Sequence, residues 1–288
     1  MANLKLILLV VIVSSISLYS ILISKPAEII PSHPSLIAFY YRVLCLLLIS
    51  STLATIALFP SNINLTVISS DNKLVEMKIC GLLTWAPFTV WSFFLMGIYF
   101  ISTFSPFYRI SFVLFEISFS VSILITVIVT FVLIPFGANE KLMMDKMYEI
   151  PTLIMHNANV YMMIGELIVY PHSFNLSDFA YIVLYGLVYT IFGWILAYFT
   201  KFYFYFFMAP SYKYAVVAHV SLIAALGSFF MIGFSILEFA NPKDNFYMGL
   251  CLLVAALGIC KFTPPPKAVN PKIKETIVKQ TRRSKKET

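Results

Sequence analysis

The feature that most constrains this chain is a series of apolar segments, each about as long as a membrane's hydrocarbon core is thick. A helix needs about twenty apolar residues to cross roughly 30 Å of hydrocarbon. Segments that meet or approach this length are Leu6–Ser24, Leu36–Phe59, Ile79–Ser102, Ile110–Phe136, Ile150–Tyr170, Phe179–Thr200, Ala215–Phe239 and Phe246–Phe262. Because a backbone in lipid must satisfy its own hydrogen bonds, and these segments lack the alternation of barrel strands, we expect transmembrane helices.

The predicted fold is therefore an all-α polytopic transmembrane helix bundle with about eight spans, six to eight being compatible with the sequence. The composition agrees, since 60% of the residues are hydrophobic, only 11% are charged and the mean hydropathy is +0.89. A water-soluble domain of this length would be far more polar. We expect a transmembrane helical domain over residues 1–262 and a polar tail over residues 263–288.

The net charge of +7 is concentrated in that tail. Its basic residues are Lys267, Lys272, Lys274, Lys279, Arg282, Arg283, Lys285 and Lys286. Basic segments next to spans stay on the cytosolic side of a membrane, so we expect a cytosolic C-terminus. Base-stacking platforms and base-reading elements are absent from the tail sequence, and a nucleic-acid partner is not expected.

The last four residues suggest a compartment. Lys285 and Lys286 stand at the positions of the C-terminal dilysine pattern that coat complexes recognise for retrieval to the endoplasmic reticulum. The alternative is that the pair belongs to an ordinary solvated charge cluster, in which case the plasma membrane is the competing location. The sequence thus predicts an endoplasmic reticulum membrane protein, with coat-complex recognition of the tail.

Signals for cofactors and metals are absent from the sequence. Cys45, Cys80, Cys251 and Cys260 lie in apolar segments without paired spacing, which is typical of small buried hydrophobic residues. No metal-ligand spacing, phosphate-binding loop or dinucleotide fingerprint occurs in the sequence. We expect neither a metal nor a cofactor.

Polar side chains inside the apolar segments are few, and each costs about 2.5 kcal/mol or more at the centre of a span. His156 is the one best suited to catalysis, since an imidazole is the usual general base near neutral pH. Taken alone, it is equally consistent with a packed hydrogen-bonding residue. Thr84 lies about six residues into the third segment and His156 about seven residues into the fifth, which runs in the same direction. At a rise of 1.5 Å per residue, both lie about 9 to 10 Å below the same membrane face.

A hydroxyl nucleophile and a base can therefore meet if these two helices pack together. The alternative for Thr84 is a hydrogen bond to its own backbone. Asn157 and Asn159 are candidates for stabilising an oxyanion. Glu116 and Glu166 are further intramembrane charges, and Glu166 lies ten residues from His156, about 15 Å along one helix, too far to orient the imidazole.

The residues around His156 resemble a known family. The stretch from Pro151 to Glu166 is similar to the core of the androgen-induced gene 1 and androgen-dependent TFPI-regulating protein family of multi-pass membrane hydrolases. Leu83 and Thr84 resemble the Leu-Thr pair that carries that family's nucleophile. The helix after His156 resembles the family's helix ending in Trp-x-Tyr-Pro-Phe, through Tyr189, Trp194, Thr200, Tyr203, Tyr205 and Phe207. Phe206 replaces the proline of that signature.

The resemblance covers roughly residues 79–239 and implies an intramembrane threonine hydrolase that cleaves fatty acid esters of hydroxy fatty acids. It implies Thr84 as nucleophile and His156 as base, with Tyr205 and Glu166 in supporting positions and membrane lipids as substrates. The other function consistent with the sequence is a non-enzymatic membrane protein, either a small transporter or an assembly partner, whose intramembrane Glu and His serve as relay or packing groups. Hydrogen-bond contact between Thr84 and His156 would separate the two.

Overall fold

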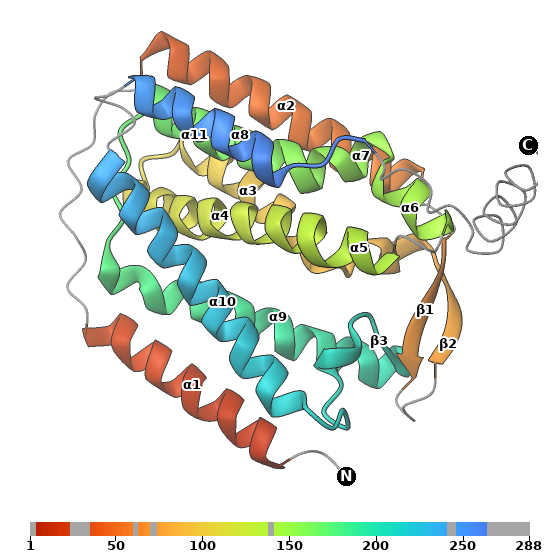
Figure 1. Ribbon diagram of the computed structural model, residues 1–288. Helices are drawn as coiled ribbons and strands as arrows, with labels where there is room; N and C mark the ends of the chain where they lie inside the picture. Colours follow the sequence, from red (N-terminus) through yellow and green to blue (C-terminus); the bar gives the residue numbers. More distant parts are fainter. Residues whose placement is uncertain are drawn as a thin grey trace, which may run out of the picture.

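The computed structural model describes residues 4–23, 35–59, 63–69, 74–137, 141–240 and 246–263, which form a bundle of roughly antiparallel helices (Figure 1). Five helical stretches are long and apolar enough to cross a membrane: Leu4–Ile23, Leu36–Leu58, Tyr108–Leu133, Leu176–Thr200 and Ala215–Phe239. Two shorter apolar helices, Phe88–Ser102 and Phe246–Ile259, lie among them. The prediction of a helical multi-pass membrane protein is therefore confirmed.

Most predicted segments correspond to helices. Four are single helices: α1 (Leu4–Ile23), α2 (Leu36–Leu58), α9 (Phe179–Thr200) and α11 (Phe246–Ile259). Three contain or adjoin a π-helical turn: α4 (Tyr108–Ile128) continues through Val129–Leu133 into α5 (Ile134–Gly137), α7 (Ile150–Leu153) continues through Ile154–Ala158 into α8 (Asn159–Val169), and α10 (Ala215–Ser235) ends in Ile236–Ala240. A short helix, α6 (Lys141–Met147), precedes α7.

The third predicted segment begins at the wrong place. We expected a helix from Ile79, but α3 spans Phe88–Ser102. Ile79 ends a β-strand, and Gly81 (φ 57°) starts a 3-10 turn, Gly81–Trp85. Pro87 then takes the N-cap position of α3, because proline lacks an N–H and is tolerated only at the start of a helix.

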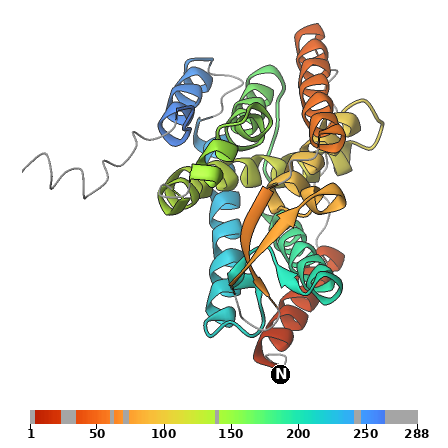
Figure 2. The same cartoon turned by 90° about the vertical axis from the view of Figure 1, so that its right-hand side faces the viewer.

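Ile79 belongs to a small sheet that no span prediction anticipated. Strands β1 (Ile63–Ser69) and β2 (Leu74–Ile79) form an antiparallel hairpin with Ile63 opposite Ile79. Strand β3 (Phe202–Tyr203), which follows α9, pairs with β1 and gives the order β2-β1-β3. Figure 2 faces this sheet at one end of the bundle, which we call the hairpin end. α1 begins and α11 ends toward the same side (Figure 1).

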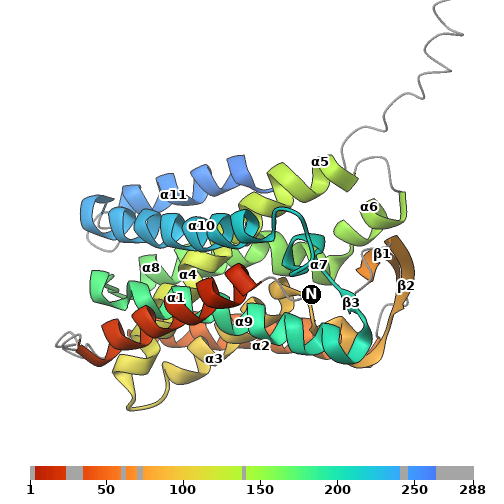
Figure 3. The same cartoon turned by 90° about the horizontal axis from the view of Figure 1, so that it is seen from below.

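Helix α4 is the centre of the bundle. It contacts α3, α8, α9 and α10, and 72% of its membrane-length window is buried, against 17% for α1. α1 lies along α9 on the outside (Figure 3), while α11 packs against α8. Since lipid would cover the outer helices, polar side chains on the inner faces of α3, α4 and α8 are the ones that need partners within the protein.

Candidate functional site

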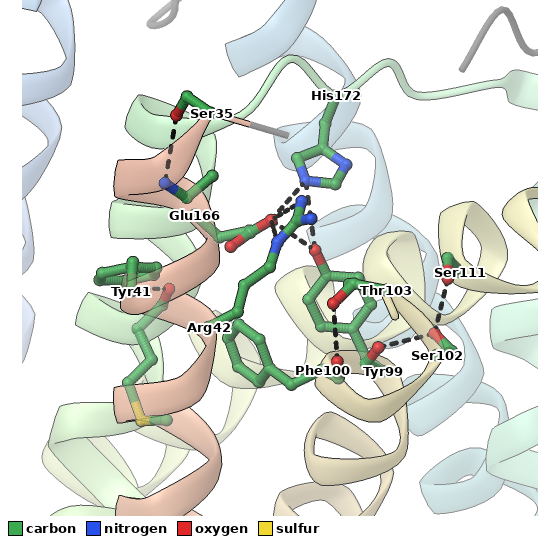
Figure 4. Close-up of polar contacts among 12 residues, drawn as sticks. Ser35, Tyr41, Arg42, Tyr99, Phe100, Ser102, Thr103, Ser111, Glu166 and His172 are labelled. Carbon is green, nitrogen blue, oxygen red and sulfur yellow. Dashed lines mark hydrogen bonds and ion pairs between the residues drawn. The ribbon is translucent and has the colours of Figure 1, made fainter. Parts of the chain in front are cut away.

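A network of charged side chains lies at the end of the bundle opposite the hairpin, where α8 connects to α9; we call this the loop end (Figure 4). Its centre is Glu166 on α8, which is fully buried. Arg42 on α2 donates to Glu166 Oε1 from Nε at 2.9 Å and from Nη2 at 2.5 Å. The Tyr99 hydroxyl of α3 donates to the same oxygen at 2.9 Å. His172 Nε2 lies 3.2 Å from this oxygen and from the Tyr99 hydroxyl.

This network connects the helices that surround it. Because a buried charge without a partner costs several kcal/mol, Arg42 and Glu166 each require the other. Arg42 also lies 4.2 Å from the centre of the Tyr170 ring, in a cation–π contact. Glu166 Oε2 has no hydrogen-bond partner among the described residues. The network therefore joins α2, α3 and α8 through one carboxylate oxygen.

His172 approaches the network from the loop after α8. Its ring stacks on Phe115 with centroids 3.7 Å apart and planes 8° apart. Burial lowers the pKa of the His172 imidazole below its usual range, and the Glu166 carboxylate offsets part of that shift. Its Nδ1 has no partner among the described residues.

The same loop closes a second buried cluster. Glu116 on α4 accepts the backbone N–H of Asn175 at 2.6 Å through Oε1. Arg109, at the start of α4, forms a bidentate ion pair with Asp178, which lies in the 3-10 turn Leu176–Asp178. Residues 172–178 thus contact both intramembrane glutamates at the loop end. Through Tyr99, Glu116 and Glu166, this short connector contacts α3, α4 and α8.

The polar groups nearer the middle of the bundle are hydroxyl, amide and imidazole side chains. His156 lies in the π-helical turn Ile154–Ala158, an irregularity that is frequent at functional sites. Thr126 of α4 lies 2.7 Å from the His156 carbonyl oxygen and 3.1 Å from Asn159 Oδ1, within hydrogen-bond distance of both. Asn159 Nδ2 lies 3.5 Å from the Ser122 carbonyl oxygen. His156 Nδ1 is buried without a hydrogen-bond partner among the described residues.

These contacts belong to a longer series of hydroxyl groups. Ser118, Ser122, Thr126 and Thr130 recur every four residues along α4 and its π-helical turn, and all are buried. Residues four apart lie on one helix face. Ser118 Oγ and Thr130 Oγ1 have no partner within the described part of the chain. We call these four residues, together with His156 and Asn159, the polar row.

Thr84 and His156 are not joined by any hydrogen bond among the described residues. The Thr84 hydroxyl donates to the Gly81 carbonyl at 2.7 Å. This is a hydrogen bond to the nearby backbone, the alternative to a catalytic role for Thr84. Thr84 also precedes α3 instead of lying inside it. The catalytic pairing of these residues stays a prediction without a contact to support it.

Two residues expected to assist catalysis make structural contacts. Asn157 donates through Nδ2 to the Lys261 carbonyl at 2.8 Å, which connects the π-helical turn to the end of α11. The Tyr205 hydroxyl accepts the Phe88 backbone N–H at 3.3 Å, at the start of α3. Lys285 and Lys286 lie outside the described residues.

Sequence reasoning missed Arg42, Tyr99 and Asp178. A signal for Arg42 existed, since a lone arginine within an apolar span must find an acidic partner, and Glu166 is one of few available. Tyr99 and Asp178 gave no such signal, because aromatic residues are common in this chain and Asp178 lies outside the segment predicted from residue 179.

Within the described residues, no group of three or more His, Cys, Asp or Glu side chains can hold a metal ion.

No family model, curated protein or solved structure matches the chain. The fold and site define a helical multi-pass membrane protein, and its function has to be inferred from the geometry of its own polar residues.

Proposed function

We propose that this chain is a small, non-enzymatic transporter that moves protons along the polar row. The observation that carries the proposal is the row itself, in which six buried polar side chains line neighbouring faces of α4 and α8 and three of their atoms lack partners. Polar groups at membrane depth are expensive and typically line ion or proton pathways.

The chemistry of the row suits protons. His156 is its titratable member, and a neutral imidazole can accept a proton on one ring nitrogen and release one from the other. Hydroxyl groups both donate and accept hydrogen bonds, so Ser118, Ser122 and Thr126 can pass a proton by reorienting. Thr130 extends the row toward the hairpin end, and Ser118 extends it by one turn beyond Ser122 toward the loop end. The His172 and Glu166 network lies at that end.

The proposal is tested by reconstituting the purified chain into phosphatidylcholine liposomes that contain a pH-sensitive dye. A potassium gradient with valinomycin imposes the membrane potential. Wild-type protein should acidify or alkalinise the lumen faster than protein-free liposomes do, and His156→Gln should abolish the difference. His219→Gln is the matched control, because His219 is also buried in a helix but bonds to the Ala215 carbonyl at 2.7 Å, outside the row.

Thermal unfolding in detergent checks that both histidine variants fold. If His156→Gln does not fold, Thr130→Val replaces a hydroxyl of the row with a methyl group of similar size and should reduce the flux. Wild-type flux equal to that of protein-free liposomes would exclude the transporter.

A second candidate is the lipid ester hydrolase that the sequence resemblance implies. The observation in its favour is a small pocket with about 10 Å³ in which the centre of a water-sized sphere can lie, and whose lining reaches Ala86, close to Thr84 in the sequence. Its lining includes Ala86, Tyr189, Phe192 and Tyr203. Aromatic and aliphatic side chains of this kind line sites for apolar ligands, and the pocket would have to widen to admit an acyl chain.

The hydrolase is tested with microsomes that express wild type, Thr84→Ala or His156→Ala. Hydrolysis of a fluorogenic lipid ester and labelling by a fluorophosphonate probe should both fall in the variants. Activity that is unchanged in both variants would exclude the Thr84 and His156 mechanism.

We also propose eight spans in the endoplasmic reticulum membrane with a cytosolic C-terminus. An even number of spans agrees with α1 beginning and α11 ending toward the same side of the bundle. In sealed microsomes, an epitope tag placed before Lys267 should be digested by added protease. Lys285→Ala with Lys286→Ala should shift the protein toward the plasma membrane; retention of the double variant in the endoplasmic reticulum would contradict retrieval by this pair.

A further inference from the structure

A small cavity lies between α3, α4 and α8, beside the polar row. Four of its lining side chains are polar: Ser92, Ser118, Ser122 and Asn159. It leaves about 10 Å³ in which the centre of a water molecule can lie, which is about the space that one buried water requires. An apolar cavity of this size would stay dry, whereas a polar one holds water when two to four partners are available.

The polar groups around the cavity can satisfy one water molecule completely. Ser118 is 3% exposed and its Oγ has no hydrogen-bond partner among the described residues, so it is free to donate. Asn159 Nδ2 lies 3.5 Å from its nearest acceptor, the Ser122 carbonyl, and so retains donor capacity. Ser122 Oγ donates to the Phe119 carbonyl at 2.7 Å and keeps its lone pairs as acceptors.

Ser92 completes the set. Its Oγ donates to the Phe88 carbonyl at 2.8 Å, and it lies 3.0 Å from the Tyr185 hydroxyl. A hydroxyl oxygen has two lone pairs, so Ser92 can accept from a further donor. A water in the cavity would thus accept from Ser118 and Asn159 and donate to Ser122 and Ser92, the four hydrogen bonds that a buried water can make.

We propose that this cavity binds one ordered water molecule that bridges α3, α4 and α8 within the membrane. The water supplies the partner that Ser118 lacks. It also connects Ser118 to Asn159, between which no direct hydrogen bond exists in the described residues. Because the water accepts from Ser118 and donates to Ser122, a proton can cross from Ser118 to Ser122 when the water takes the Ser118 proton and gives one of its own to Ser122 Oγ. That role rests on the proposed transporter, whereas the presence of the water does not.

The test is X-ray radiolytic footprinting of the full-length protein in lipid nanodiscs. Radiolysis of a bound water produces hydroxyl radicals that oxidise the side chains beside it. Met96 and Phe93 line the cavity and are each 2% exposed. Met163, which is fully buried and is not part of the lining, is the matched control. Met96 should be oxidised several-fold faster than Met163.

Ser118→Val should fill the cavity and lower Met96 oxidation to the rate of Met163. If the valine variant does not fold, Ser118→Ala removes the hydroxyl without adding volume, and Met96 oxidation should still fall. Equal oxidation of Met96 and Met163 in wild type, or Met96 oxidation that neither substitution changes, would overturn the proposal. A footprint without proton flux would retain the water and exclude the transporter, so the two failures are distinguishable.

Discussion

At the loop end of the bundle, charged side chains form ion pairs across helices. The polar row in the middle is built from hydroxyl, amide and imidazole groups, and it holds no ion pair among the described residues. Arg42 and Glu166 have each other, and Arg109 has Asp178. His156 Nδ1, Ser118 Oγ and Thr130 Oγ1 have no such partners in the described chain. The difference suggests a division of roles, in which the ion pairs hold helices together and the groups of the polar row bind or pass something else.

The largest expected effect comes from breaking the paired charges. Arg42→Leu leaves Glu166 charged and buried, and we expect a loss of about 3 to 5 kcal/mol in the free energy of unfolding. Arg42→Leu combined with Glu166→Leu removes both charges and should recover most of that loss. The measurement is reversible unfolding in mixed micelles.

Lys146→Ala is the control for that series, because it removes an ion pair with a largely exposed Glu149 and should change stability by at most about 1 kcal/mol. If the Arg42→Leu variant and the double variant were equally unstable, the ion pair would not be what holds this end.

A somewhat smaller loss should follow Gly165→Ala. A Cβ atom at Gly165 would overlap the Tyr41 hydroxyl, which donates to the Met162 carbonyl at 2.7 Å. Overpacking of this kind costs about 1 to 3 kcal/mol. Gly258→Ala is the control, because its Cβ would meet nothing within 4 Å. Equal unfolding midpoints for the two variants would show that α2 and α8 are not in this close contact.

In the polar row, a substitution should reduce proton transport much more than it reduces stability. Thr126→Val loses hydroxyl contacts to the His156 carbonyl and Asn159, and should cost about 1 kcal/mol. The proton flux should fall much further than that loss of stability explains. Thr190→Val on α9 removes only a backbone hydrogen bond to Gly186 and should leave the flux unchanged. A Thr126→Val variant with normal flux would show that the polar row has only a structural role.

The smallest expected effect concerns pH. Because burial lowers the pKa of His172 in the folded state, that state binds a proton less readily than the unfolded chain does. The resulting stability is present above the unfolded pKa of about 6.5 and is lost as pH falls through and below that value. Between roughly pH 7.5 and 5, where histidine titrates, the wild-type melting temperature should fall more than that of His172→Gln. Parallel curves would show that His172 protonation is not coupled to folding.

The sequence predicted the helices well where hydrophobicity alone determines them. α9 and α10 begin at the expected residues, Phe179 and Ala215, because polar or aromatic connectors precede long apolar segments. The predicted start of α3 was wrong because an apolar residue such as Ile79 fits a strand as well as a helix. Only its pairing with Ile63 decides between the two.

Candidate sites were harder to predict than helices. His156 and Glu166 were identified because ionisable groups are rare in spans, yet their partners come from α2, α3, α4 and a loop far away in the sequence. Ser118, Ser122 and Thr126 gave no signal of their own, since hydroxyl residues in membrane helices usually bond to their own backbone. Their importance depends on the atoms that stay unpaired after packing, which sequence spacing does not reveal.

The most direct test of the account is chemical rescue of proton flux in liposomes that contain His156→Ala. If the imidazole ring of His156 carries protons, His156→Ala should lose the flux and added imidazole should restore it. The increase should exceed that measured with imidazole in protein-free liposomes and with His219→Ala. A folded His156→Ala variant with wild-type flux, or one whose lost flux imidazole does not restore, would contradict the proposed relay.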